Sequence, residues 1–159
     1  MESIISVKHI TKTAETSYGK FTEKMLSLLG RIGEDDFKQM KLNPHGAKDH
    51  MAALGGFEDL ILFGTQEHGT LLRLAGQQRN AIQVILGNPL IALQMTQHDI
   101  RAALYAPLRL LVYETAPDTL NIEYDLPSTL FSQFGHPDVT ATGLLLDTKL
   151  DKLINECLS

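Results

Sequence analysis

Two short segments of the chain combine residue types that bind ligands at the starts of helices. Glu67 and His68 stand side by side before a helix-like segment, and Gly87-Asn88-Pro89 follows a run of apolar residues. A carboxylate beside an imidazole can orient it for proton transfer or ligand binding. Asn before a helix and Pro at its first position are typical of a helix N-terminus, where free N–H groups can hold a carboxylate or phosphate.

Each segment also has a purely structural interpretation. Gly87, Asn88 and Pro89 are the residues that helix starts favour without any ligand. Glu67 and His68 can form a solvated turn, and adjacent residues on a helix point apart, so their direct pairing is not assured. We nevertheless take these five residues as the candidate ligand-binding set. We expect the His68 turn and the Asn88 turn to meet at the ends of neighbouring strands and enclose one pocket.

Other candidate chemistries find less support in the sequence. His45 and His50 are five residues apart, which displaces them by about 140° on a helix, whereas zinc-chelating pairs stand three or four apart. Asp49 has the better spacing to His45, but no third ligand is near, so we predict no metal site. Cys157 falls on an apolar helical stripe, and the chain has neither a Gly-x-Ser-x-Gly elbow nor a phosphate-binding loop. No cofactor is indicated.

Composition limits the class of protein. The chain has 159 residues, enough for one domain with its own core, and a 43% hydrophobic content is ordinary for a globular protein. Its 14 Lys and Arg against 19 Asp and Glu argue against nucleic acid or an anionic membrane as partner. A single cysteine excludes an internal disulfide, and the apolar stretches are too short to span a bilayer. We therefore expect a cytoplasmic location.

The elements that must position these residues follow from periodicity. Alternation predicts strands near 4–11, 60–63, 82–86, 108–114 and 120–124, with a turn at 64–69. Apolar residues spaced three or four positions apart predict helices near 21–32, 34–55, 71–75, 89–97, 127–134 and 137–157. The last two strands form a hairpin. We therefore predict a single α+β domain over 1–159, a two-layer sandwich with helices mainly on one face.

The predicted sheet is mixed, mostly antiparallel and of about five strands. Helices on one face leave the other face uncovered, and dimerisation is the usual way to cover it, so we expect a homodimer. Tyr113 and Tyr124 fall on the hairpin as possible cross-strand neighbours, and Tyr105 is a possible pocket residue. Core or interface packing is the simpler role for all three.

The order of several motifs resembles the bacterial and archaeal "domain of unknown function 302" family. The motifs are Glu67-His68, then Ile85–Pro89, then Ala106–Glu114, then Tyr124–Pro127. The resemblance covers residues 3–30 and 56–155, and 31–55 is identified as a helical insertion. Glu67 and Leu86 stand where the family often has Asp and Phe, and Leu90–Met95 replaces a run richer in Gly and Lys. The resemblance implies a two-layer, dimeric α/β domain and no particular reaction.

Three functional hypotheses follow. The first is a non-catalytic domain that binds or senses a small anionic molecule as a homodimer, through Glu67, His68, Gly87, Asn88 and Pro89. The second is a small enzyme that uses His68 as acid and base, with the helix start at Asn88 as anion site and Glu67 or Tyr105 as partner. The third is a protein-interaction module that docks through residues 31–55, which requires an exposed apolar patch there.

Overall fold

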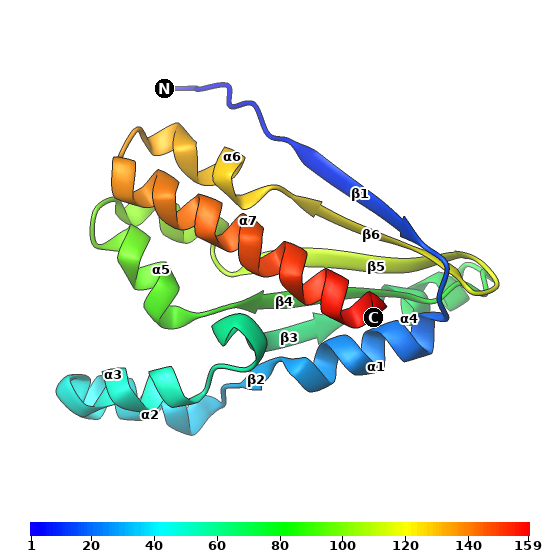
Figure 1. Ribbon diagram of the computed structural model, residues 1–159, viewed down its shortest axis with the longest axis horizontal. Coiled ribbons are helices and arrows are strands. Elements are labelled where there is room, and N and C mark those ends of the chain that lie inside the picture. Colours follow the sequence, from blue (N-terminus) through cyan, green and yellow to red (C-terminus); the bar gives the residue numbers. More distant parts are fainter.

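Six strands form one mixed sheet in the computed structural model, which describes residues 1–159 (Figure 1). Their spatial order is β1-β6-β5-β4-β3-β2. The strands are β1 (His9–Ala14), β2 (Gly30–Arg31), β3 (Ile61–Gln66), β4 (Ala81–Gly87), β5 (Leu108–Ala116) and β6 (Thr119–Asp125). Only β2 and β3 run parallel; all other neighbours are antiparallel. The predicted α+β class is confirmed, with six strands instead of about five.

Four of the seven helices begin at a side-chain cap. Ser17, Asn43, Asn88 and His136 each accept a backbone N–H from the first turn that follows, and Pro follows the last three caps directly. The helices are α1 (Tyr18–Leu28), α2 (Glu34–Leu42), α3 (Pro44–Ala53), α4 (His68–Leu74), α5 (Pro89–Thr96), α6 (Pro127–Phe131) and α7 (Pro137–Leu158). Short 3-10 turns are η1 (Phe57–Asp59), η2 (Ile100–Tyr105) and η3 (Ser132–Phe134). None of these helices is long and apolar enough to cross a membrane.

Strand alternation separates the two faces of the sheet. Val84, Leu110 and Ile122 are fully or almost fully buried against the helix layer, which includes α1 and the long α7 (Figure 1). The alternate residues Gln83 and Leu111 point to the opposite face and are only half-buried. We call this opposite side the uncovered face. Residues of α4 and of η2 line hollows together with strand residues of the uncovered face, so these two elements border that face.

Two local predictions were wrong, and the η2 turn was not predicted. The first strand begins at His9, beyond the alternating Ile5 and Val7, and ends at Ala14. The segment predicted as a turn over 64–69 instead continues β3 to Gln66, after a bulge between Leu62 and Gly64. The η2 turn had no counterpart in the sequence-based prediction. The helices predicted over 34–55 are present as α2 and α3, which form a hairpin at one end of the sheet (Figure 1).

Candidate functional site

The His68 turn and the Asn88 turn do not meet. Strands β3 and β4 are antiparallel, with Gln66 opposite Gln83 and Ile61 opposite Gly87. His68 follows the end of β3 and Asn88 follows the end of β4, so the two residues lie at opposite ends of this strand pair. Each lines a hollow that the other does not reach. The prediction of one pocket between them was wrong, and an enzyme that uses both residues in one step has no geometric basis.

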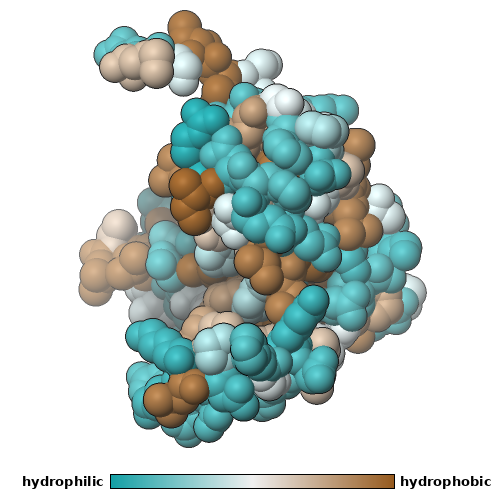
Figure 2. Space-filling model, turned by 90° about the vertical axis from the view of Figure 1, so that its left-hand side faces the viewer, coloured by the Kyte–Doolittle hydropathy of each residue, from teal (hydrophilic) through white to brown (hydrophobic).

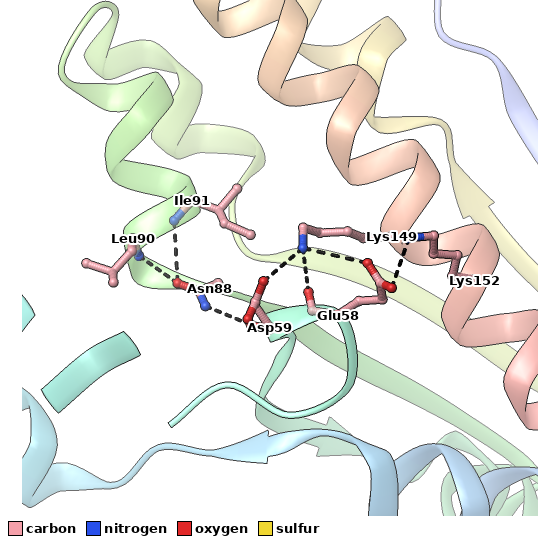
Figure 3. A network of polar contacts seen from close by, with 7 residues as sticks. All are labelled: Glu58, Asp59, Asn88, Leu90, Ile91, Lys149 and Lys152. Atoms are coloured by element: carbon pink, nitrogen blue, oxygen red, sulfur yellow. Dashed lines mark hydrogen bonds and ion pairs between the residues drawn. The ribbon is translucent and has the colours of Figure 1, made fainter. Parts of the chain in front are cut away.

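Asn88 has a structural role that occupies its amide. Its side chain is buried, and Oδ1 accepts the N–H groups of Leu90 at 2.8 Å and Ile91 at 3.4 Å (Figure 3). Its Nδ2 donates to the backbone oxygen of Asp59 at 2.7 Å, which ties the start of α5 to η1. The first N–H groups of α5 therefore already have an acceptor, and an anion at this helix start would have to displace the cap.

His68 lies at the start of α4, half-buried, in an open hollow of about 680 Å³ on the uncovered face. Arg79 and the strand residues Tyr113 and Glu123 line the same hollow. Glu67 is exposed, gives α4 no side-chain cap and is not among the lining residues. Of the two adjacent residues chosen from the sequence, only His68 therefore contacts a cavity with other titratable groups.

A network of polar side chains crosses three strands beside this hollow. The Tyr113 hydroxyl donates to Glu123 Oε1 at 2.5 Å and accepts from Asn121 Nδ2 at 3.1 Å. His9, on the neighbouring strand, lies 3.1 Å from Glu123 Oε2 through Nε2 and 2.9 Å from Asp125 Oδ1 through Nδ1. Glu123 is thus held from both sides, by a phenol of β5 and an imidazole of β1.

The network moves the pKa values of its members. The hydrogen bond from Tyr113 lowers the pKa of Glu123; partial burial opposes this shift, and the bond with His9 adds to it. The hydrogen bonds with Asp125 and then Glu123 raise the pKa of His9. These pKa shifts favour an ionised Glu123 next to a protonated His9 on the uncovered face.

A second hollow, of about 190 Å³, adjoins the first. The β5–β6 register begins at Leu111 opposite Glu123, and the hollow lies where the two strands extend beyond this pair. Gln83, Leu111 and Glu123 line both hollows. Arg109 and Tyr105 line only the second. The two hollows therefore form a trough with shared walls and Glu123 at the junction; the first hollow lies on the uncovered face, and the second also reaches Leu108, Tyr124 and Leu150, which are buried on the helix side. We call this the sheet trough.

The strand pairing determines which residues several tyrosines and histidines contact. Tyr113 and Tyr124 are not cross-strand neighbours, because Tyr113 opposes Asn121 on the uncovered face and Tyr124 is buried on the helix side. His9 was isolated in the sequence and reaches Asp125 only because β1 pairs with β6. His50 contacts Asp36 at 2.6 Å, which joins α3 to α2.

One group has the composition of a metal-ligand set. His98, His136 and Asp138 each place one possible ligand atom within 4.8 Å of the others, and the two imidazole rings stack with centroids 4.4 Å apart. Imidazole and carboxylate suit zinc. His136 Nδ1 is engaged as the cap of α7, and Asp138 is exposed. The cluster therefore has a structural explanation, and the absence of a metal site stays a prediction.

Cys157 is buried on α7, and burial raises the pKa of its thiol to about 11. A nucleophilic role needs a thiolate in an exposed, electropositive setting. The surroundings of Cys157 favour the neutral thiol instead, which agrees with its position on the apolar stripe.

Comparisons of the sequence and of the fold with known proteins both find one protein family. A family model described as "Domain of unknown function DUF302" matches residues 47–157. The fold resembles the crystal structure of an uncharacterized conserved DUF302 protein from Bacillus stearothermophilus, with a TM-score of 0.65 and 16% identity over 94% of this chain and 97% of that chain. At this identity the likeness shows the fold alone. No curated protein matches the chain.

Proposed function

The chain belongs to the DUF302 family, and from this premise we propose that it is a non-catalytic domain that binds or senses a small anionic molecule in the sheet trough, as a homodimer. One observation carries the proposal. The hollow of about 680 Å³ brings His68 and Arg79 together with Tyr113 and Glu123 on a face that no helix layer covers. Its volume lies within the range of small-molecule sites.

The lining indicates the chemistry of the ligand. Leu71, Leu72 and Leu111 supply apolar surface, and Arg79 supplies a fixed positive charge. A molecule with an apolar body and one carboxylate or phosphate fits this combination. The acidic Glu123, which also lines the hollow, disfavours a second negative charge and accepts hydrogen bonds from hydroxyl or amino groups.

The homodimer would cover the trough. Leu71 on α4 is 58% exposed and Leu104 on η2 is 80% exposed, one at each border of the uncovered face. Apolar side chains at both ends of an open sheet favour a partner that buries them together, and a second copy satisfies this by two-fold symmetry. We also propose a cytoplasmic location, which agrees with one unpaired, buried cysteine.

Thermal-shift screening of the purified chain against metals, nucleotides, haem and acidic metabolites tests ligand binding. A ligand that binds only the folded state raises the midpoint of unfolding by mass action. The proposal expects the shift to shrink in Arg79→Ala and in His68→Ala. Arg73→Ala and His45→Ala are the matched controls, since both residues are exposed and line neither hollow of the trough. Equal shifts in all four variants would place the ligand elsewhere.

Light scattering after size exclusion tests the homodimer. Leu71→Glu and Leu104→Glu are expected to convert a dimer into a monomer, because each puts a charge in the proposed interface. Leu42→Glu is the control: Leu42 is 80% exposed like Leu104, but lies on the α2–α3 hairpin. A monomeric wild type contradicts the dimer outright.

The enzyme remains the second candidate, with a changed set of residues. His68 shares its hollow with Tyr113 and Glu123 rather than with Glu67, and the expected anion site at Asn88 is at the other end of the strands. A ligand found by the screen and chemically altered during incubation, but not by the His68→Ala variant, would favour this candidate over simple binding. The third candidate, docking through 31–55, gains no support from surface composition, because the hairpin forms a mostly hydrophilic lobe at the bottom of Figure 2.

A further inference from the structure

A further cavity lies on the helix side at the end of β4 and adjoins the sheet trough only at Pro107 and Leu108, which line both. Its volume is about 200 Å³, and Gly87, Asn88 and Pro89 form part of its wall. Large apolar side chains from five elements or loops complete it: Phe37, Phe63, Ile91, Met95, Pro107 and Phe131. Figure 2 shows apolar surface in the hollow between the lobe of the α2–α3 hairpin and the body of the molecule.

The lining offers almost no hydrogen-bonding capacity. Asn88 and Thr96 are its polar residues, and the amide of Asn88 already bonds Leu90, Ile91 and Asp59 (Figure 3). A water molecule needs two to four polar partners, so a cavity of this kind holds water poorly. A charged or strongly polar group entering it would lose its hydration without replacement.

We infer that this cavity binds an uncharged apolar group, either a single aromatic ring or a short branched alkyl chain, and that Phe37 of the α2–α3 hairpin forms its outer wall. The size agrees, since an engineered apolar cavity of about 150 Å³ is enough for benzene. Aromatic rings at positions 37, 63 and 131 allow edge-to-face contacts with an aromatic guest. Gly87 keeps its part of the wall free of a side chain.

Phe37 is the one lining residue outside the segment that the family model matches. It is on α2, a helix without any buried residue, and its side chain is 39% exposed although one face lines the cavity. Residue 37 also precedes the segment matched by the family model, which begins at residue 47, whereas every other lining residue falls inside that segment. The α2–α3 hairpin therefore closes the outer side of a cavity whose other walls lie within the matched segment.

Fluorine NMR titration of the full chain with fluorobenzene tests the inference. We expect saturable binding by the wild type. Ala92→Leu and Ala103→Leu each extend a lining side chain into the cavity and should abolish binding. Phe37→Ala removes the outer wall from a partly exposed position and should weaken binding about tenfold, the equivalent of one lost aromatic contact. Circular dichroism confirms that each variant is folded.

Two controls separate this cavity from other surfaces. Leu42→Ala removes an exposed side chain from the same hairpin without touching the cavity, and His68→Ala alters only the sheet trough. Both should bind fluorobenzene like the wild type. Saturable binding that survives both cavity-filling variants, a linear and unsaturable response, or loss of binding in His68→Ala would each overturn the inference. Ligand binding in the sheet trough is tested by its own variants, Arg79→Ala and His68→Ala. Either proposal, the trough site or the apolar cavity, can therefore fail while the other holds.

Discussion

The hydroxyl of Tyr113 lies 2.5 Å from Glu123 Oε1, although the two residues are not direct cross-strand partners. Tyr113 opposes Asn121, and Glu123 opposes Leu111, so the bond runs diagonally across the β5–β6 hairpin. Such diagonal pairs are within reach of a long aromatic side chain. The bond fixes the carboxylate at the junction of the two hollows and is the largest cause of the lowered pKa of Glu123.

Replacing Tyr113 by Phe should raise the pKa of Glu123 toward its ordinary value, since the first cause of its depression is removed. His9→Ala should also raise this pKa, because it removes both the hydrogen bond and the positive charge of His9. Carbon NMR titration of the side-chain carboxyl measures both. Tyr105→Phe, in the same trough but not bonded to Glu123, is the control. An unchanged pKa of Glu123 in Tyr113→Phe would contradict the role of this bond.

His9 should make stability depend on pH in a defined direction. Its folded-state pKa is raised, so the protonated imidazole stabilises the fold below the unfolded pKa of about 6.5, and this contribution is lost as pH rises through the folded pKa. His9→Ala should therefore lose stability at pH 5.5 and approach the wild type at pH 9. Urea unfolding at both values measures the difference. A loss that is equal at the two pH values would show that His9 acts through packing alone.

The position of β1 shows what periodicity misses. Alternation at Ile5 and Val7 predicted a strand over 4–11, but the observed strand turns Ile10, Lys12 and Ala14 toward the helix layer. A Lys at an inward position breaks the apolar pattern. It is tolerated because Lys12 Nζ reaches Asp151 Oδ1 on α7 at 2.5 Å, so its stem packs while its charge is paired. No local pattern reveals a partner on the last helix.

The failure of the predicted pocket has a topological cause. Turn chemistry correctly indicated a helix at Pro89, because a cap depends on adjacent residues. The helix after His68 has no side-chain cap and was predicted, over 71–75, from its apolar residues alone. Whether two such starts meet depends on strand direction, and the antiparallel pairing of β3 with β4 separates them. The His9–Glu123–Tyr113 network was invisible for the same reason, since its members come together only through the order β1-β6-β5.

Lys149 should contribute far more stability than the neighbouring Lys152. Lys149 is 7% exposed, and its Nζ donates to the backbone oxygen of Glu58 at 2.8 Å and to Asp59 Oδ2 at 3.1 Å (Figure 3). Lys149→Ala should cost about 2–3 kcal/mol, the value of a charged hydrogen bond removed from a buried site.

Lys152→Ala is the matched control, because Lys152 bonds the same Glu58 at 3.0 Å but is largely exposed. A surface ion pair of this kind is worth less than about 1 kcal/mol. Chemical denaturation gives both free energies of unfolding. Equal losses in the two variants would mean that burial of Lys149 adds nothing to its contacts with η1.

Gly56 should tolerate no side chain, because it holds the base of the α2–α3 hairpin against the sheet. A Cβ at Gly56 would lie 2.2 Å from Leu28 O and 2.3 Å from Gly30 N, and both are backbone atoms that cannot rotate away. Gly56→Ala should therefore destabilise the protein by about 3 kcal/mol, near the upper range for overpacking. Gly19→Ala is the opposite case, since its Cβ meets nothing within 4 Å and its position is helical, so it should gain about 0.5–1 kcal/mol. Urea unfolding compares the two, and a Gly56→Ala variant as stable as the wild type would show that the hairpin is free to move away from the strands.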